Sequence, residues 1–236
     1  MNDAMHTEPR FPLPPRRILA VADATPAARN AIWRAALLAR ESGASLNVLH
    51  VLRDARGADA ARSSLEQLCA CIEERVGVQA AVEMPRGDLL REATRAARDA
   101  DLLVLASRPG NTLRERISGA PVERLIRLSR IPALVVKRPA APPRGASLAD
   151  AALRGSYARV LVSVDLGRGA GGGIAAARHL SHDPAMEVFH AVSARREAPR
   201  DGAAEAPAAG ATAVERARTT LRAAIAAAGT HGRGAA

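Results

Sequence analysis

The sequence predicts an α/β protein built around an open parallel sheet with helices on both faces. Between residues 17 and 137, short continuous apolar runs alternate with amphipathic stretches of helical periodicity. Continuous apolar runs are typical of parallel strands that are covered on both faces. The alternation gives five strands joined by four helices, and strand–helix–strand connections of this kind are right-handed in nearly all proteins. A shorter version of the same pattern begins again near residue 157.

The composition indicates which kinds of partner the protein can bind and in which cell compartment it works. Hydrophobic residues make up 48% of the chain but aromatic residues only 2%, so the core is built from Val, Leu, Ile and Ala. The net charge of +10 comes almost entirely from arginines spread along the whole chain. Without aromatic side chains for stacking, this charge does not indicate nucleic-acid binding. The sequence has neither a signal peptide nor an apolar run of membrane-spanning length, so we expect a cytoplasmic protein with no membrane contact.

The first strand and the first helix are bounded by clear signals. Residues 1–15 form a polar, proline-rich lead that we expect to be disordered. The first strand is Arg17–Ala22. Thr25 suits the N-cap of the helix that follows, and Pro26 suits its first turn. That helix ends at Gly43, because glycine readily adopts the left-handed conformation that terminates helices.

The next two pairs of strand and helix follow the same rules. The second strand is Ser45–Val51 and the third is Val78–Met84. The helix between them has one apolar stripe, made by Leu65, Leu68, Cys69, Ile72 and Val76. The helix after the third strand has its stripe on Leu89, Ala93, Ala96 and Ala97. Cys69 and Cys71 are expected to be reduced thiols, because their spacing suits neither a disulfide nor a zinc site.

A glycine-containing loop after the fourth strand is the first candidate for a binding site. The strand that opens at Asp101 leads into a loop that contains Gly110 and Gly119, and a helix follows. A helix that starts after a parallel strand presents backbone N–H groups to an anion. The fifth strand is Ala133–Val136, so residues 16–137 form one complete domain.

After a Pro-, Ala- and Gly-rich linker at 138–156, the chain repeats itself. The first strand returns at 159–165 as Arg-Val-Leu-Val-Ser-Val-Asp, and the end of the second strand returns at 188–190 as Val-Phe-His. We place a partial second unit at 157–228, with a disordered segment at 193–211 and a tail at 229–236. The sequence holds no counterpart of the last three strands. A sheet of only two strands is marginally stable alone, so this unit must pack against the first domain, pair with another chain or be loosely folded.

Together these signals resemble the universal stress protein family, in the tandem form in which two such domains share one chain. The resemblance rests on the order of a strand ending in Val-Ala-Asp23, a strand ending in Leu-His-Val51, the strand after Asp101, the glycine loop, Val122-Glu-Arg124 and Ile131-Pro132-Ala. It covers residues 16–137 as a whole domain and 157–228 as a partial one. It implies the strand order 3-2-1-4-5.

The resemblance also implies a nucleotide site. Many members of the family bind ATP through a Gly-x2-Gly-x9-Gly-Ser/Thr loop, an acid after the first strand and main chain after the second strand. No metal site of the protein's own is implied. The positions of this chain that correspond to the site are Asp23, Ala24, Val51, Ser107, Gly110, Gly119 and Ala120.

Three departures from the loop pattern weaken the implied contacts. Ser107 stands where the first glycine belongs, eight residues separate Gly110 from Gly119, and Ala120 replaces the hydroxyl residue. A lost hydroxyl removes a hydrogen bond that contributes about 0.5 to 1.5 kcal/mol. Arginines of the loop, at positions 108, 114 and 116, could offset this loss as phosphate ligands.

Several other features have two readings. Asp23 suits either a ligand or a stabilising charge at a helix N-terminus, whereas for Asp165 the helix charge is favoured. The stretch Gly167–Gly172 matches a dinucleotide-binding fingerprint, but composition drift explains it better because its acidic partner and a full sheet are missing. His50 and His190 are expected to be hydrogen-bonded core histidines. No set of nucleophile, base and orienting residue is evident.

Three functions follow from these observations. The first is a cytoplasmic, non-enzymatic stress-response protein that acts by protein interaction, with weak nucleotide binding. The second is an ATP-binding switch or weak ATPase that uses the loop from Ser107 to Ala120. The third is a structural homodimer, in which the edge strand from Ala133 to Lys137 pairs with a second copy.

Overall fold

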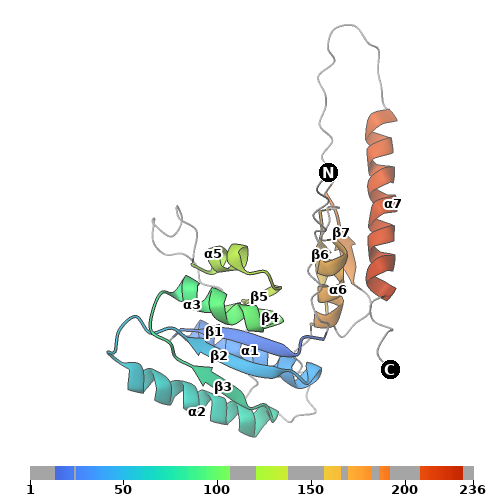
Figure 1. Cartoon of the computed structure of the whole chain (residues 1–236). Helices are drawn as coiled ribbons and strands as arrows, with labels where there is room; N and C mark the ends of the chain where they lie inside the picture. The colour runs from blue at the N-terminus through green and yellow to red at the C-terminus, as the bar shows by residue number, and fades with distance from the viewer. Residues whose placement is uncertain are drawn as a thin grey trace, which may run out of the picture. The chain divides into compact units, whose positions relative to one another are not determined.

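The chain divides into two compact units, and we call Phe11–Ser156 the first unit and Tyr157–Ala236 the second unit. The structure is a computed structural model, and it describes residues 14–23, 25–106, 121–137, 157–165, 170–181, 186–191 and 208–230 (Figure 1). Among these residues, no helix is both long enough and apolar enough to cross a membrane.

The first unit is organised by a five-stranded parallel sheet, as the sequence predicted. Its strands are β1 (Arg17–Ala22), β2 (Ser45–His50), β3 (Ala80–Glu83), β4 (Leu102–Ala106) and β5 (Ala133–Val136). They lie in the order β3-β2-β1-β4-β5, and every neighbouring pair is parallel. The predicted strand order is therefore confirmed. β1 lies in the centre of the sheet, with β2 on one side and β4 on the other.

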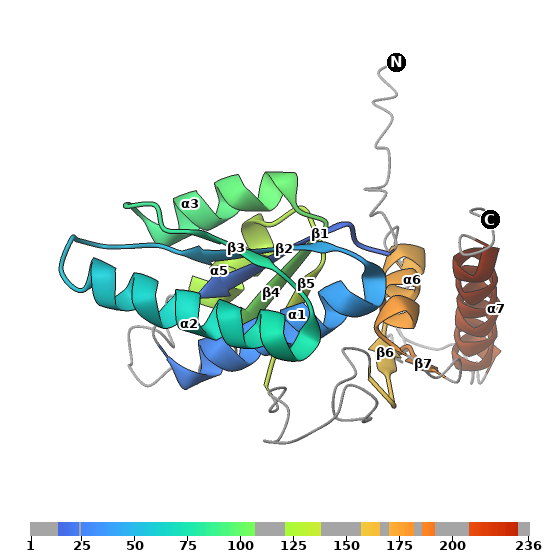
Figure 2. The same ribbon diagram turned by 90° about the horizontal axis from the view of Figure 1, so that it is seen from below.

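Helices cover both faces of this sheet. They are α1 (Pro26–Ser42), α2 (Ala58–Val76), α3 (Leu89–Ala96) with a short 3-10 turn η1 (Ala97–Asp99), and α5 (Pro121–Leu128). Figure 2 shows α1 and α2 on one face and α3 on the opposite face. α5 contacts α3 and shares its side of the sheet.

The two ends of α1 confirm the expected signals. The Thr25 side chain accepts a hydrogen bond from the Ala28 N–H, and Pro26 occupies the first turn. Gly43 ends the helix with φ of 67°, in the left-handed region that glycine adopts without strain. Between these ends, α1 buries a continuous alanine-rich face against β1 and β4. Small side chains here let the helix approach the sheet closely.

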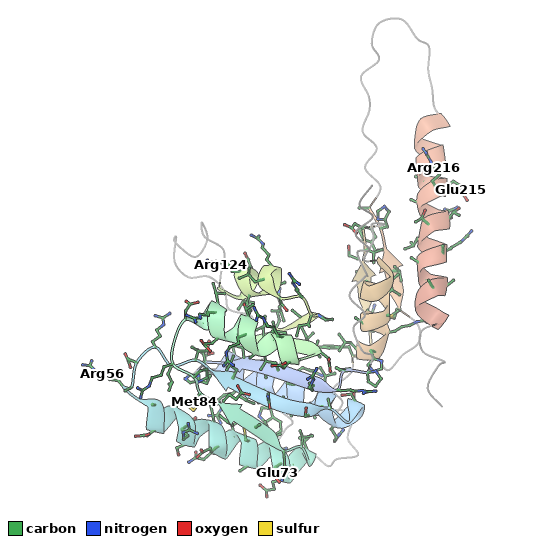
Figure 3. The ribbon with its side chains drawn as sticks, viewed as in Figure 1. Arg56, Glu73, Met84, Arg124, Glu215 and Arg216 are labelled. Atoms are coloured by element: carbon green, nitrogen blue, oxygen red, sulfur yellow. The ribbon has the colours of Figure 1, made fainter. Side chains whose placement is uncertain are left out.

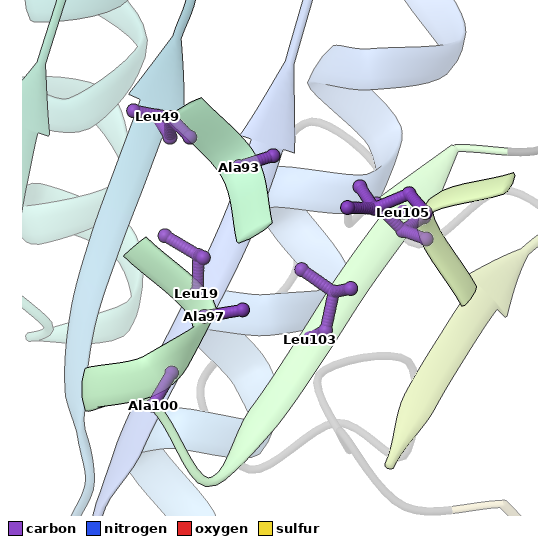
Figure 4. Packing of buried hydrophobic residues seen from close by; sticks show 8 residues of the cluster. Leu19, Leu49, Ala93, Ala97, Ala100, Leu103 and Leu105 are labelled. Carbon is purple, nitrogen blue, oxygen red and sulfur yellow. The ribbon is translucent and has the colours of Figure 1, made fainter. Parts of the chain in front are cut away.

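A core of leucines and alanines fills the space between the sheet and the α3 side. Leu19, Leu49, Leu103 and Leu105 come from the strands, Ala93 from α3, Ala97 from η1, Ala100 from the segment before β4, and Leu125 from α5 (Figure 4). Leu49 and Leu103 are completely buried. The aromatic-poor composition is thus matched by a core in which alanine faces leucine.

The cysteines lie on α2 as the helical stripe predicted. Cys69 is buried in the core, Cys71 is half-buried, and both are free thiols. Burial, with a smaller contribution from Glu66, raises the pKa of the Cys69 thiol. A thiol in this environment stays protonated and is a poor nucleophile.

The second unit is a small strand–helix–strand fold with an additional helix. It contains β6 (Leu161–Ser163), α6 (Ala170–Leu180), β7 (Glu187–Phe189) and α7 (Ala208–Thr230). β6 and β7 are parallel neighbours in a two-stranded sheet. Its buried residues are Val162, Val164 and Ile174, against which Leu221, Ala224 and Ile225 of α7 pack.

One boundary in this unit corrects the sequence prediction. Residues 193–211 were expected to be disordered, but α7 begins at Ala208 and is therefore helical over the last part of that segment. The physical reason is the high helix propensity of alanine, which offsets the glycine at position 210. The linker at 138–156 lies outside the described residues, and the tandem interpretation of the chain stays a prediction.

Candidate functional site

The carboxyl edge of the first sheet is where the strand order reverses. Ala22, the last residue of β1, pairs with His50, the last residue of β2. On the other side of β1, Val21 pairs with Leu105 of β4. The chain after β1, the chain after β2 and the chain after β4 therefore leave the sheet side by side. Ligands of open α/β sheets bind in this position.

Asp23 follows β1 directly and its side chain is held by the start of α1. Its Oδ1 accepts a hydrogen bond from the Thr25 N–H, with an N···O distance of 2.9 Å, and a second one from the Thr25 hydroxyl. Thr25 Oγ1 in turn accepts from the Ala28 N–H at 3.3 Å. This chain of hydrogen bonds fixes the carboxylate at the carboxyl edge, and it also caps the helix.

His50 ties the end of β2 to the end of β1. Its Nδ1 lies 3.2 Å from the Ala22 carbonyl oxygen. Because a carbonyl oxygen can only accept, Nδ1 carries the proton of this bond. The imidazole is half-buried, as expected for a hydrogen-bonded core histidine. The bond holds the backbone on either side of it, which leads into Asp23 and into Val51.

The chain after Val51 is also fixed. The Leu52 N–H donates to the Pro85 carbonyl at 2.9 Å, and the Gly87 N–H donates to the Leu52 carbonyl at 3.0 Å. This short ladder continues the pairing of β2 and β3 beyond the ends of both strands. Val51 is therefore held between two anchored neighbours, His50 and Leu52. A main-chain ligand position needs this kind of rigidity.

Exposed cations stand near this edge. Arg56 projects from the connection between β2 and α2, whereas Glu73 lies toward the opposite end of α2 (Figure 3). The Arg56 backbone N–H donates to Asp54 Oδ1 at 2.8 Å, which orders the connection locally. Arg86 is exposed in the connection between β3 and α3. These side chains add positive charge beside the site.

The structure brings two of the predicted site residues to one edge. Asp23 and Val51 follow neighbouring strands and are both half-buried. The other predicted residues, Ala24, Ser107, Gly110, Gly119 and Ala120, lie outside the described residues, as do the loop arginines. Within the described part of the chain, no group of three metal-binding side chains occurs.

Two of the contacts that shape this site were not predicted from the sequence. The ladder through Leu52 is made by backbone atoms in an irregular segment, so no side-chain pattern signals it. The contact of His50 with β1 had a signal in the repeat, because His190 recurs at the corresponding position. The Asp-x-Thr spacing of residues 23 to 25 also signals the observed cap.

Comparison with known proteins gives one consistent result. Residues 15–137, slightly more than half of the chain, match the Universal stress protein family. No curated protein matches the chain. Among solved structures, a universal stress protein in complex with cAMP is 18% identical, with 51% of this chain and 95% of that chain covered and a TM-score of 0.45.

Two further solved structures are similar over the same length. A protein of the universal stress protein family from Burkholderia pseudomallei is 25% identical, with 52% of this chain and 96% of that chain covered and a TM-score of 0.40. The universal stress protein from Archaeoglobus fulgidus in complex with dAMP is 18% identical, with 51% and 96% covered and a TM-score of 0.42. The match to the family ends at residue 137, directly after β5.

Proposed function

Because the chain belongs to the universal stress protein family, we propose that it is a cytoplasmic, non-enzymatic stress-response protein that acts by protein interaction and binds a nucleotide weakly. The observation that supports a ligand at the carboxyl edge is the meeting of Asp23 and Val51 where the strand order reverses. Asp23 is oriented before any ligand arrives, because Thr25 already holds its side chain. Orientation in advance lowers the entropy lost on binding.

The binding is proposed to be weak because the phosphate end of the site departs from the family pattern. Ser107 and Ala120 replace a glycine and a hydroxyl residue, and the glycine spacing is one residue short. Each lost hydrogen bond reduces affinity by about 0.5 to 1.5 kcal/mol, or roughly 2- to 12-fold. A member that keeps the acid and the main-chain position but loses phosphate contacts holds the nucleoside part better than the phosphates.

We expect isothermal titration calorimetry with ATP and magnesium to show saturable heat only at nucleotide concentrations approaching millimolar. The suitable comparison ligands are AMP and cAMP, which share the adenosine group but carry one phosphate. If the loop contributes little, these ligands bind about as well as ATP. We also expect no phosphate release from ATP above the buffer rate. Turnover of ATP by the purified chain would instead support the alternative of a weak ATPase.

The variant that tests the role of Asp23 is Asp23→Asn. Asparagine keeps the Oδ1 acceptor that holds Thr25, so the cap of α1 survives, while the negative charge is lost. We expect the thermal midpoint to stay close to that of the wild type and the nucleotide heat to fall. Unchanged nucleotide binding in this variant would mean that Asp23 serves only the helix start. No heat in the wild type at millimolar nucleotide would remove nucleotide binding from the proposal.

For the partner, we propose a homo-oligomer formed through the strand from Ala133 to Lys137. β5 is the last strand of its sheet, and Ala133, Leu134 and Val135 are only half-buried. An edge strand presents N–H and C=O groups that a second copy can pair with around a twofold axis. Light scattering on the full chain tests this, and a monomer at micromolar concentration contradicts it.

A further inference from the structure

The second unit repeats the strand arrangement of the first, down to one side-chain contact. His190 Nδ1 lies 2.8 Å from the Val164 carbonyl oxygen, as His50 Nδ1 lies against the Ala22 carbonyl oxygen. In both units the histidine ends or directly follows the second strand, and the carbonyl belongs to the residue that ends or directly follows the first strand. These two bonds fix the correspondence of the units. Leu161 then corresponds to Leu19, and Phe189 to Leu49.

The corresponding residues have opposite environments. Leu19 and Leu49 are 2% and 0% exposed, because the alanines of α3 and η1 cover them (Figure 4). Leu161 and Phe189 are 68% and 52% exposed. Ile174 of α6 and three residues of α7 pack on the side of Val162 and Val188, which is the other face of the two-stranded sheet. Within the described part of the second unit, one face of the sheet is therefore covered and the other is bare.

We call Leu161, Ser163, Glu187 and Phe189 the open face. These residues alternate with buried or half-buried ones along β6 and β7, and all four are exposed. In the strand register, Leu161 lies opposite Glu187 and Ser163 opposite Phe189. The two large apolar side chains thus lie on one diagonal and the two polar residues on the other. An apolar side chain can insert beside the small serine of a facing sheet.

The residue types on the open face indicate contact with a protein. Phe189 is one of only two phenylalanines in a chain with 2% aromatic residues, and it is exposed rather than in the core. Aromatic residues are enriched at the centres of protein interfaces. Burying Phe189 and Leu161 would also add apolar area to a unit whose own core contains only three buried residues among those described.

The charges around the open face favour a second copy over other partners. Arg159 is exposed just before Leu161, and Glu187 lies across from Leu161. Neither forms an ion pair among the described residues. A nucleic acid or an anionic membrane offers no partner for Glu187, whereas a copy of the same face brings one charge of each sign. Two copies can therefore pair Arg159 with Glu187 in both directions around the apolar centre.

We propose that the open face binds the open face of a second copy of this chain. The two sheets pack against each other, with α6 and α7 on the outside of each, and Leu161 and Phe189 fill the space between them. This interface is separate from the edge of β5, because it lies in the other unit. A chain that uses only the open face forms a dimer, and a chain that uses both twofold contacts assembles beyond the dimer.

The test is the mass of the full chain by sedimentation velocity over a range of concentrations. Phe189→Asp is expected to lower the mass of the assembly, because it places two like charges at the centre of the contact. Where the open face is the only contact, the mass falls from that of a dimer to that of a monomer. Val214→Asp is the matched control, since Val214 is an apolar residue of the same unit that is 46% exposed on α7. We expect this control to keep the wild-type mass. Leu134→Lys, at the β5 edge, distinguishes the contributions of the two interfaces to the mass, because it acts on β5 pairing alone.

A charge exchange keeps the test decisive if Phe189→Asp fails to fold. Arg159→Glu and Glu187→Arg are each expected to weaken the assembly about tenfold or more, and the double exchange is expected to restore it. The proposal is overturned if neither Phe189→Asp nor the single exchanges change the mass, or if only Leu134→Lys does. We expect Phe189→Asp to lose assembly without any change in the heat of nucleotide binding. This result would show that assembly through the open face does not depend on nucleotide binding by the first unit.

Discussion

Leu49→Ala is expected to lower the free energy of unfolding of the first unit by about 2 to 5 kcal/mol. Leu49 is 0% exposed on β2, beside the central strand, and packs in the cluster under α3 (Figure 4). The neighbouring alanines Ala93 and Ala97 are too small to fill the cavity that the substitution leaves. Urea denaturation followed by circular dichroism measures the change.

The control for this prediction is Leu128→Ala on α5, a leucine that is 54% exposed. Surface substitutions away from special contacts change stability by about 0.5 kcal/mol or less. The two substitutions remove the same atoms, so the difference between them measures burial. Equal losses from Leu49→Ala and Leu128→Ala would mean that the described core does not stabilise the sheet.

Asp101→Ala is expected to destabilise the first unit by about 2 to 4 kcal/mol, because it leaves two backbone donors without their acceptor. Asp101 Oδ2 accepts from the Arg16 N–H and from the Arg17 N–H, each at 2.9 Å. The residue is 9% exposed and precedes β4, so it joins the start of β4 to the start of β1. The same denaturation experiment measures the loss.

Three controls distinguish these amide hydrogen bonds from a simple ion pair. The Arg17 guanidinium lies 3.9 Å from Asp101 Oδ1, but its side chain is 57% exposed, so Arg17→Ala is expected to have little effect. Asp101→Asn keeps one acceptor oxygen and should lose less than the alanine variant. Asp99→Ala, at an exposed neighbouring acid, should be neutral. If Arg17→Ala lowered the free energy of unfolding as much as Asp101→Ala, the ion pair and not the amide hydrogen bonds would hold β4 to β1.

Much of the first unit could be predicted because its elements carry local signals. β1 has the predicted bounds, since a charged residue at either end delimits a continuous apolar run. α1 has the predicted cap and end, since threonine, proline and glycine act on their own backbone. β3 is shorter than the predicted Val78–Met84, because its ladder with β2 begins only where Ala80 meets Leu46. Pairing, and not the apolar run, sets the ends of that strand.

Contacts between residues far apart in the sequence could not be predicted in the same way. Asp101 reaches amides that lie 84 and 85 residues away in the sequence, and no local pattern encodes such a contact. The direction of the His50 ring also depends on the β1 strand beside it. In the second unit, the sequence indicated missing strands, but the exposure of Leu161 and Phe189 needed the packing of α6 and α7 on the other face.

The most direct test of the proposed function is an ATP titration of isotope-labelled full chain followed by backbone amide NMR shifts. We predict shifts that saturate near millimolar nucleotide and are confined to the carboxyl edge, at the amides around Asp23 and Val51. Amides at the opposite edge, around Arg17 and Asp101, are predicted to stay unchanged. The absence of any shift, or shifts centred on that opposite edge, would contradict nucleotide binding at the carboxyl edge.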